Sequence, residues 1–291
     1  MSFLAEPFGV VMKFLYENLA FGNYGVAIIL FTLFVRILLF PLTLKQQKSL
    51  LLTQSLQPEL DALKRSCGDD REMLMQEQQK LYAKYNVNPM AGCLPMLIQF
   101  PILIVVYNII RQPLTYIAGF SSEVIAKLGE IVGKTGNLAE HEISRFFLNS
   151  ANITPEVAKT LSECGVQTGQ FVNMTFLKVF DLGVAPWKFF NGGEGGKVAW
   201  EYAPLLLIPI VTLVSQYFLQ WMTSPNRKRD KKADDPSMRS MNVMMKVMPL
   251  MTFFIAFTTP AGLGFYWVIG NLLSVGQTAL INKVFVKKKE G

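Results

Sequence analysis

Four long apolar runs dominate the pattern of hydrophobic and polar positions along the chain. Residues 24–44 are interrupted by a single charge, Arg36, and residues 89–110 and 202–222 carry none. An uncharged apolar run of about 18 residues or more is a candidate membrane span. The fourth run, 247–281, is too long for one crossing at about 1.5 Å per residue. The pattern therefore predicts a membrane protein built from helices.

The fourth run divides at a turn. The sequence Thr258-Thr259-Pro260-Ala261-Gly262 combines residues that end helices and open turns. The run then supplies two helices, at about 243–259 and 263–281. The expected fold class is all-α, a polytopic membrane protein with five transmembrane helices.

The residues before the first run form a separate element. Phe8, Val11, Leu15 and Leu19 recur at helical spacing. Residues 1–22 are therefore expected to form an amphipathic helix that lies on the membrane surface. The pattern of a cleaved signal peptide is lacking here. The remaining residues, 23–291, would form the membrane domain.

A hydrophilic segment, 45–88, separates the first two crossings. It contains leucines at spacings of four and three, a proline at Pro58 that favours a helix start, and a turn at Cys67–Asp70. Two antiparallel helices, a helical hairpin, are expected. A plain connector explains the segment less well than a partner-binding role, because a connector needs only a few residues.

A second long segment, 113–198, separates the second and third crossings. Its amphipathic stretch has apolar positions on one helical face, and Thr154-Pro155-Glu156 resembles a helix start. The apolar positions of that face are Val124, Ile125, Leu128, Ile131 and Val132. The role of this segment stays open.

The distribution of basic residues predicts the orientation. The formal net charge is +7, and lysines and arginines cluster in 45–88, in 224–246 and in the C-terminal tail. Short loops rich in Lys and Arg stay in the cytoplasm. The hairpin and C-terminus should therefore lie inside, and the N-terminus and 113–198 outside. Nucleic-acid binding is a weaker explanation of the same charge, and no direct nucleic-acid function is expected.

Composition excludes several other classes of protein. Hydrophobic residues make up 51% of the chain and charged residues 17%, which is too apolar for a disordered chain and too poor in charge for an ordinary soluble enzyme. Three cysteines and one histidine support neither a disulfide framework nor a metal site. No enzyme motif or phosphate loop is found. We expect no catalytic residues, no metal and no cofactor.

Arg36 is the most informative residue. A charged arginine at the centre of a crossing costs about 2.5–3.5 kcal/mol on insertion scales, and arginine cannot escape that cost by losing its proton. A buried arginine that snorkels is one explanation. An arginine that faces a wet cavity, with Thr32 one turn earlier on the same face, is the sharper one.

Three other crossings carry polar side chains. Gln99 stands between Pro95 and Pro101 in the second crossing, and a polar stripe follows one face of the third crossing and another follows one face of the fifth. The stripes are Thr212, Ser215, Gln216, Gln220 and Thr223, and Asn271, Ser274, Gln277 and Thr278. Each stripe alone is more typical of a helix-packing seam. Together with Arg36 they favour a polar groove, and the absence of acidic residues from the cores of the crossings argues against a proton-coupled transporter.

Several ordered motifs resemble the YidC/Oxa/Alb membrane protein insertases. They are Val35-Arg36, Leu39-Phe40-Pro41-Leu42, Asn88-Pro89 with Pro95, Gln99-Phe100-Pro101-Ile102, Met248-Pro249, Pro260-Ala261-Gly262-Leu263, Tyr266-Trp267 and Asn271. The resemblance covers nearly the whole chain, and the hydrophilic hairpin matches in position.

The resemblance implies an insertase and chaperone of the bacterial plasma membrane that works without nucleotide hydrolysis. Its groove would be open to cytosol and lipid and closed outside, lined by the polar residues named above: Arg36, Thr32, Gln99, Ser215, Gln216, Gln220, Asn271, Ser274 and Gln277. Nascent membrane proteins and membrane lipid are the implied partners, and dependence on the Sec translocon, the ribosome or the signal recognition pathway stays open. A channel or transporter subunit is the alternative, and a structural scaffold a third.

Overall fold

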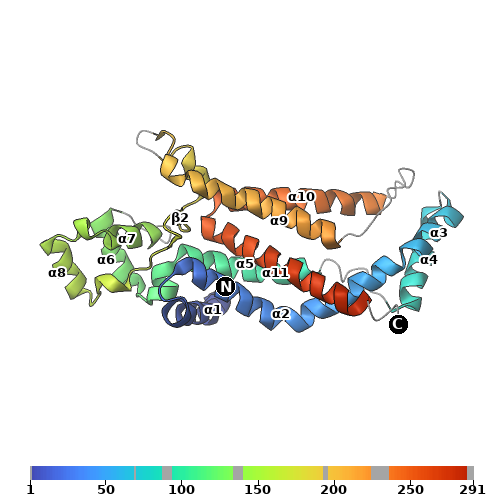
Figure 1. The fold of residues 1–291 in the computed structure, drawn as a ribbon, viewed down its shortest axis with the longest axis horizontal. Helices are drawn as coiled ribbons and strands as arrows, with labels where there is room; N and C mark the ends of the chain where they lie inside the picture. The colour runs from blue at the N-terminus through green and yellow to red at the C-terminus, as the bar shows by residue number, and fades with distance from the viewer. Residues whose placement is uncertain are drawn as a thin grey trace.

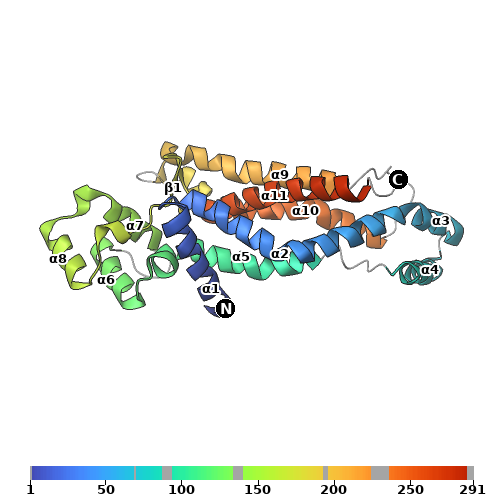
Figure 2. The same ribbon diagram turned by 60° about the horizontal axis from the view of Figure 1, so that its bottom comes forward.

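The computed structural model describes residues 2–68, 70–86, 94–133, 140–192, 196–223 and 236–286. These residues are mostly helical and form an elongated molecule (Figure 1). A bundle of long helices occupies the middle. A pair of shorter helices lies at one end and a group of short elements at the other (Figures 1 and 2).

Each predicted crossing corresponds to a helix of the bundle. The helices are α2 (Tyr24–Ser55), α5 (Leu94–Arg111), α9 (Leu207–Thr223), α10 (Pro236–Thr258) and α11 (Ala261–Val286). A 3-10 turn, η8 (Trp200–Leu206), leads into α9. The expected turn between the last two helices is confirmed, because α10 ends at Thr258 and α11 begins at Ala261.

Several helix boundaries differ from the prediction. α2 continues past Leu44 to Ser55, α10 begins at Pro236 instead of 243, and α11 continues past Ile281 to Val286. α9 begins at Leu207, because a 3-10 turn covers the first residues of the predicted crossing. The lysines and glutamines after Leu44 are good helix formers, so the local sequence does not stop α2 where hydrophobicity ends. The bundle helices therefore extend beyond the apolar runs on the side of the hairpin.

Length and hydropathy together mark two of these helices as candidate membrane spans among the described residues. They are Tyr24–Thr53 and Trp200–Thr223, and two shorter apolar helices cover Gln99–Arg111 and Lys246–Thr258. α11 has 26 residues, but Asn271 and Gln277 stand in its middle and lower its hydropathy. The same polar residues give α11 its place at the centre of the bundle, where it packs between α9 and α2.

The N-terminal residues form α1 (Ser2–Phe14) and a π-helical turn, η1 (Leu15–Leu19). Met12 and Leu15 are buried, whereas Val10 and Phe14 are exposed. The helix packs against α2, α5 and the segment that follows α5. A helix therefore forms over much of the predicted range, with one apolar face on the bundle and further apolar side chains on its outer surface, and its position on the membrane surface stays a prediction.

The helical hairpin consists of α3 (Gln57–Cys67) and α4 (Arg71–Lys84), which pack against each other. Pro58 lies in the first turn of α3, as its fixed φ favours. Asp70 caps α4, because its side chain accepts a hydrogen bond from the Met73 N–H at 3.0 Å. Local sequence signals thus place both helix starts.

The segment between α5 and α9 folds into a unit that we call the outer subdomain. Its helices are η3 (Leu114–Ala118), α6 (Ser122–Val132), α7 (Glu140–Leu148), η4 (Ser150–Asn152), α8 (Pro155–Glu163), η5 (Thr168–Gln170) and η6 (Pro186–Phe189), and its two antiparallel strands are β1 (Thr175–Phe176) and β2 (Phe180–Asp181). The strands were not predicted. Thr154 caps α8 as expected, through a 3.3 Å bond from the Val157 N–H.

The outer subdomain has a hydrophobic core of its own. Leu128, Ile143 and Phe147 are at most 2% exposed, and the Phe147 and Phe171 rings stack at 4.7 Å. The predicted apolar face of α6 packs on this core. A segment that the sequence presents as a long loop is therefore a folded unit.

Candidate functional site

Arg36 lies where the hydrophobic core of the bundle ends. On α2 the buried cluster runs from Tyr24 to Val35, and on α11 it runs from Ala261 to Tyr266. Both stretches are at the end of the bundle that carries the outer subdomain (Figure 1). Arg36 follows directly after Val35. Apolar packing fills the end of the bundle next to the outer subdomain, and Arg36 lies on the side of this packing that faces the helical hairpin.

The guanidinium of Arg36 is held by the backbone of α11. Its Nη2 donates to the Gly270 carbonyl at 2.9 Å. A Cβ at Gly270 would lie 3.2 Å from the same Nη2, so glycine allows this close approach. Among the described residues no carboxylate lies within ion-pair distance of Arg36. Its positive charge is therefore uncompensated by the part of the chain that is described.

Two predicted site residues accompany Arg36 at Gly270. The Ser274 hydroxyl donates to the same Gly270 carbonyl at 2.9 Å, and Thr32 is 1% exposed. The Thr32 hydroxyl is bonded to the Ile28 carbonyl at 2.6 Å, one turn back in its own helix. Both hydroxyls satisfy backbone carbonyls and leave Arg36 as the group that can bind a further partner.

Ser215, Asn271 and Gln277 join helices. The Asn271 amide donates to the Ser215 hydroxyl at 3.0 Å, which ties α11 to α9. The Gln277 amide donates to the Thr43 hydroxyl at 2.7 Å, which ties α11 to α2. The sequence left two roles open for these three residues, a helix-packing seam and the lining of a groove. Their hydrogen bonds between helices favour the packing seam.

The remaining predicted residues are Gln99, Gln216 and Gln220. Gln99 on α5 donates to the Tyr266 hydroxyl at 3.2 Å, one turn before Gly270. Gln216 and Gln220 on α9 are half-buried, and Gln216 Oε1 is shielded from solvent without a hydrogen-bond partner among the described residues. The structure thus divides the predicted group: Arg36, Gln99, Ser215, Asn271 and Gln277 bond across helix contacts, and Thr32 and Ser274 bond within their own helices.

Sequence reasoning missed two glutamines in the part of α2 that leads to the helical hairpin. Gln47 donates to the Thr278 hydroxyl at 3.0 Å, and Gln46 is 7% exposed with an Nε2 that lacks a partner in the described structure. Arg36, Thr43 and Gln47 differ by seven and four positions, which places them on one helical face. That spacing could have found Gln47, but the predicted crossing ended at Leu44.

Comparison with known proteins decides the family. A family model described as the 60Kd inner membrane protein matches residues 14–289. The chain belongs to the YidC/Oxa/Alb family.

Relatives in this family include bacterial and chloroplast proteins. A membrane protein insertase YidC of Oceanobacillus iheyensis is 32% identical over 92% of this chain and 77% of its own length. One of Clostridium tetani is 27% identical over 97% and 92%. An inner membrane ALBINO3-like protein 2 of Chlamydomonas reinhardtii is 31% identical over 94% of this chain, which spans only 54% of that relative.

Most residues that carry the family resemblance fall at helix centres or ends. Arg36 and Pro41 are in α2, Gln99 and Pro101 in α5, and Pro249 in α10. Pro260 precedes the first residue of α11. Asn88, Pro89 and the side chain of Pro95 lie outside the described residues, as do the basic positions between 224 and 235.

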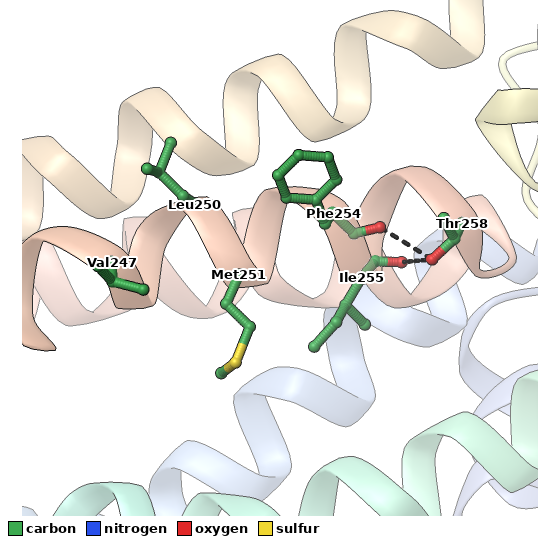
Figure 3. Close-up of a pocket in the computed structure, with 6 residues that line it drawn as sticks. All are labelled: Val247, Leu250, Met251, Phe254, Ile255 and Thr258. Carbon is green, nitrogen blue, oxygen red and sulfur yellow. Dashed lines mark hydrogen bonds between the residues drawn. The ribbon is translucent and has the colours of Figure 1, made fainter.

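An open apolar groove of about 510 Å³ follows α10. It is lined by Val247, Leu250, Met251, Phe254, Ile255 and Thr258, and Figure 3 shows Met251 and Ile255 projecting to the same side of the helix. The Thr258 hydroxyl is turned back onto the Phe254 carbonyl at 2.8 Å. The lining offers apolar surface and no free hydrogen-bonding group to an occupant.

Proposed function

We propose that this chain is a membrane protein insertase that spans the membrane with five helices. The observation that carries the proposal is the position of Arg36: a permanent charge at the inner edge of the apolar core, bonded to one carbonyl and paired with no carboxylate among the described residues. A guanidinium has five N–H donors, so most of its bonding capacity remains for water or a substrate. The insertase names of the bacterial relatives support this function over a channel or transporter.

The proposed orientation places the hairpin in the cytosol and the outer subdomain outside. The two lie at opposite ends of the bundle (Figure 1), and the lysines and arginines of segment 45–88 fit the cytosolic side. We further propose the plasma membrane of a bacterium, because the chain spans more of its bacterial relatives than of the chloroplast ones. Cysteines placed at Ser121 and at Met75 should react with an impermeant reagent from opposite sides.

The proposed mechanism uses charge first and hydrophobicity second. Arg36 attracts acidic side chains in the substrate's translocated tail, and a hydrated groove around Arg36 shortens the path of that tail through hydrocarbon. Apolar substrate segments then leave along apolar helix faces such as the α10 groove. Burial of those segments in lipid is favourable by itself, so neither nucleotide nor catalytic residue is required.

The hairpin is proposed to receive a delivery partner, for which the Sec translocon, the ribosome and the signal recognition pathway are the candidates. Met73 and Met75 on α4 are 51% and 61% exposed, and methionines adapt to varied apolar surfaces. Replacement of residues 58–82 by a flexible linker should leave a folded bundle that inserts poorly in cells. Unimpaired insertion at native expression would remove this part of the proposal.

The decisive experiment measures insertion by purified protein in liposomes. Arg36→Ala should lower the insertion yield of a substrate with an acidic translocated tail roughly tenfold or more, because one charge-assisted bond contributes about 1.5–3 kcal/mol. Arg36→Lys should keep part of the yield, and a neutralised tail should depend less on residue 36. Lys159→Ala on exposed α8 is the matched control.

The same vesicles separate the alternatives. Solute flux without insertion would establish a channel or transporter, and neither activity would favour a scaffold. Equal yields for Arg36→Ala and the unaltered protein on every acidic substrate would refute the electrostatic mechanism.

A further inference from the structure

The two short strands of the outer subdomain form a β-hairpin with an unusual tip. Phe176 pairs with Phe180, and the Val179 N–H returns to the Phe176 carbonyl at 3.2 Å. Leu177 and Lys178 between them have φ of +52° and +61°. Glycine and asparagine are the usual residues in this conformation, and a leucine there is strained.

The tip is also apolar and open. Leu177 is 65% exposed and Val179 is 51% exposed. Phe21, three residues before the start of α2, is 90% exposed and has a positive φ of +49°. In water Leu177 and Phe21 would combine backbone strain with exposed hydrocarbon, and Val179 would expose hydrocarbon as well. Polar residues would serve better at each of these positions.

Contacts fix the position of the β-hairpin along the bundle. Phe176 packs against Gly25 in the first turn of α2, where a Cβ would come within 2.2 Å of its ring. The Phe176 and Phe265 ring centroids are 5.1 Å apart. After β2, the Leu182 carbonyl accepts the Gly262 N–H at 2.8 Å. The hairpin therefore sits at the outer ends of α2 and α11.

We propose that the tip of the β-hairpin, Leu177–Val179, inserts into the outer leaflet together with Phe21 and anchors the outer subdomain to lipid. This inference rests on the proposed five-helix membrane orientation, in which the outer ends of α2 and α11 mark the membrane surface. Exposed apolar side chains at that depth meet the boundary between headgroups and acyl chains. Lys178 at the turn can reach the lipid phosphates while its stem stays apolar.

The occupant is phospholipid because the tip continues an apolar surface. Val10 and Phe14 on α1 are 68% and 57% exposed, and α1 and β1 both pack against α2. A protein partner would leave these further apolar side chains in water. A bilayer covers all of them with one surface.

The test places a nitroxide-sensitive fluorophore at single cysteines in a background where Cys67, Cys93 and Cys164 are serine. The protein is reconstituted in phosphatidylcholine and phosphatidylglycerol vesicles without nitroxide, with lipids that carry a nitroxide near the headgroup, and with lipids that carry one midway along the acyl chain to reach the label at residue 37. The labelled variants are Leu177→Cys, Phe21→Cys, Lys159→Cys as an aqueous control on exposed α8, and Ile37→Cys as a lipid-facing control on α2. Ile37 is 65% exposed.

The proposal predicts that nitroxide lipids quench labels at 177 and 21 several-fold more than the label at 159. Quenching at 177 no greater than at 159, with strong quenching at 37, would overturn the anchor and leave the membrane orientation intact. Weak quenching at 37 as well would overturn the orientation and the anchor with it.

Discussion

The helix bundle and the outer subdomain expose different side chains: apolar ones on the surface of the bundle, and charged ones such as Lys127 and Lys159 on helices of the outer subdomain. On the bundle surface Ile37, Val214 and Phe254 are 65%, 62% and 63% exposed, whereas Thr32 is 1% exposed inside it. In the outer subdomain Leu128 is fully buried, as an ordinary globular core requires. One chain thus satisfies two solvents. The comparison indicates that the bundle is built for lipid and the outer subdomain for water.

The polar networks of the two regions also differ in charge. Those inside the bundle join neutral amides and hydroxyls, such as Asn271 with Ser215. Those of the outer subdomain use charges: His141 Nε2 lies 2.8 Å from Asp181 Oδ1, and Arg145 donates to the Tyr202 hydroxyl at 2.9 Å. A charge is costly away from water, which makes Arg36 the exception that calls for a function.

The largest expected effect is on the stability of the hydrophobic core of the outer subdomain. Phe147→Ala should destabilise the outer subdomain by about 3–5 kcal/mol, because the ring is 2% exposed and stacks on Phe171. Phe254→Ala, of the same size but on the surface of α10, should change stability little in lipid. Hydrogen exchange of residues 140–192 measures the first, and thermal unfolding in vesicles the second. Similar losses for both variants would contradict the two-solvent comparison.

The next effect concerns a buried carboxylate that joins α7 to η3. Glu140 accepts the Leu114 N–H at 2.8 Å, the Thr115 N–H at 2.9 Å and the Thr115 hydroxyl at 2.7 Å. Glu140→Ala leaves these donors without a partner and should cost the outer subdomain on the order of 3 kcal/mol. Glu140→Gln keeps an acceptor and should cost less. Equal exchange rates in the two variants would show that the hydrogen bonds contribute little.

Asp181 should make the stability of the outer subdomain depend on pH. Burial alone would raise the pKa of Asp181, but the hydrogen bond and charge of His141, the Gly183 N–H and Arg145 together lower it below the ordinary value. A carboxylate with a lowered pKa stabilises the fold above its unfolded pKa, and this contribution is lost as the pH falls through the folded value.

Asp181→Asn should therefore cost about 2 kcal/mol at pH 7. The difference should begin to shrink as the pH falls below about 4, the ordinary pKa of an aspartate, and should vanish only below the lowered pKa of the folded state. Denaturation of the outer subdomain as a function of pH provides the measurement. A difference that stays constant from neutral to acid pH would exclude the ionised carboxylate as its cause.

The smallest effect is expected within the bundle. Asn271→Leu removes the bond to Ser215 and should cost only about 0.6 kcal/mol, the average for a hydrogen bond between membrane helices. The neighbouring change Leu272→Asn places an amide on a surface that is 57% exposed, and in lipid it should cost more. Thermal unfolding in vesicles compares the two. The reverse order would indicate that this side of α11 faces water.

Local signals in the sequence predicted the helices and several of their ends. Pro58, Asp70 and Thr154 start helices in the structure as their positions indicate, since a cap or a first-turn proline acts within a few residues. The apolar runs likewise predicted the bundle helices. Where the chain gave no stop signal, as after Leu44, hydrophobicity alone misplaced the boundary.

The sequence by itself also singled out Arg36, because one charge in an apolar run is visible without any partner. Its acceptor, Gly270, lies 234 positions away along the chain, and no pattern near Arg36 points to it. The division of the polar stripes into packing contacts, the docking of Glu140 on η3 and the core around Phe147 were also decided by the tertiary structure. The physical reason is common to all of them: spacing within a helix fixes which face a side chain occupies, but only the packing of distant segments decides what that face meets.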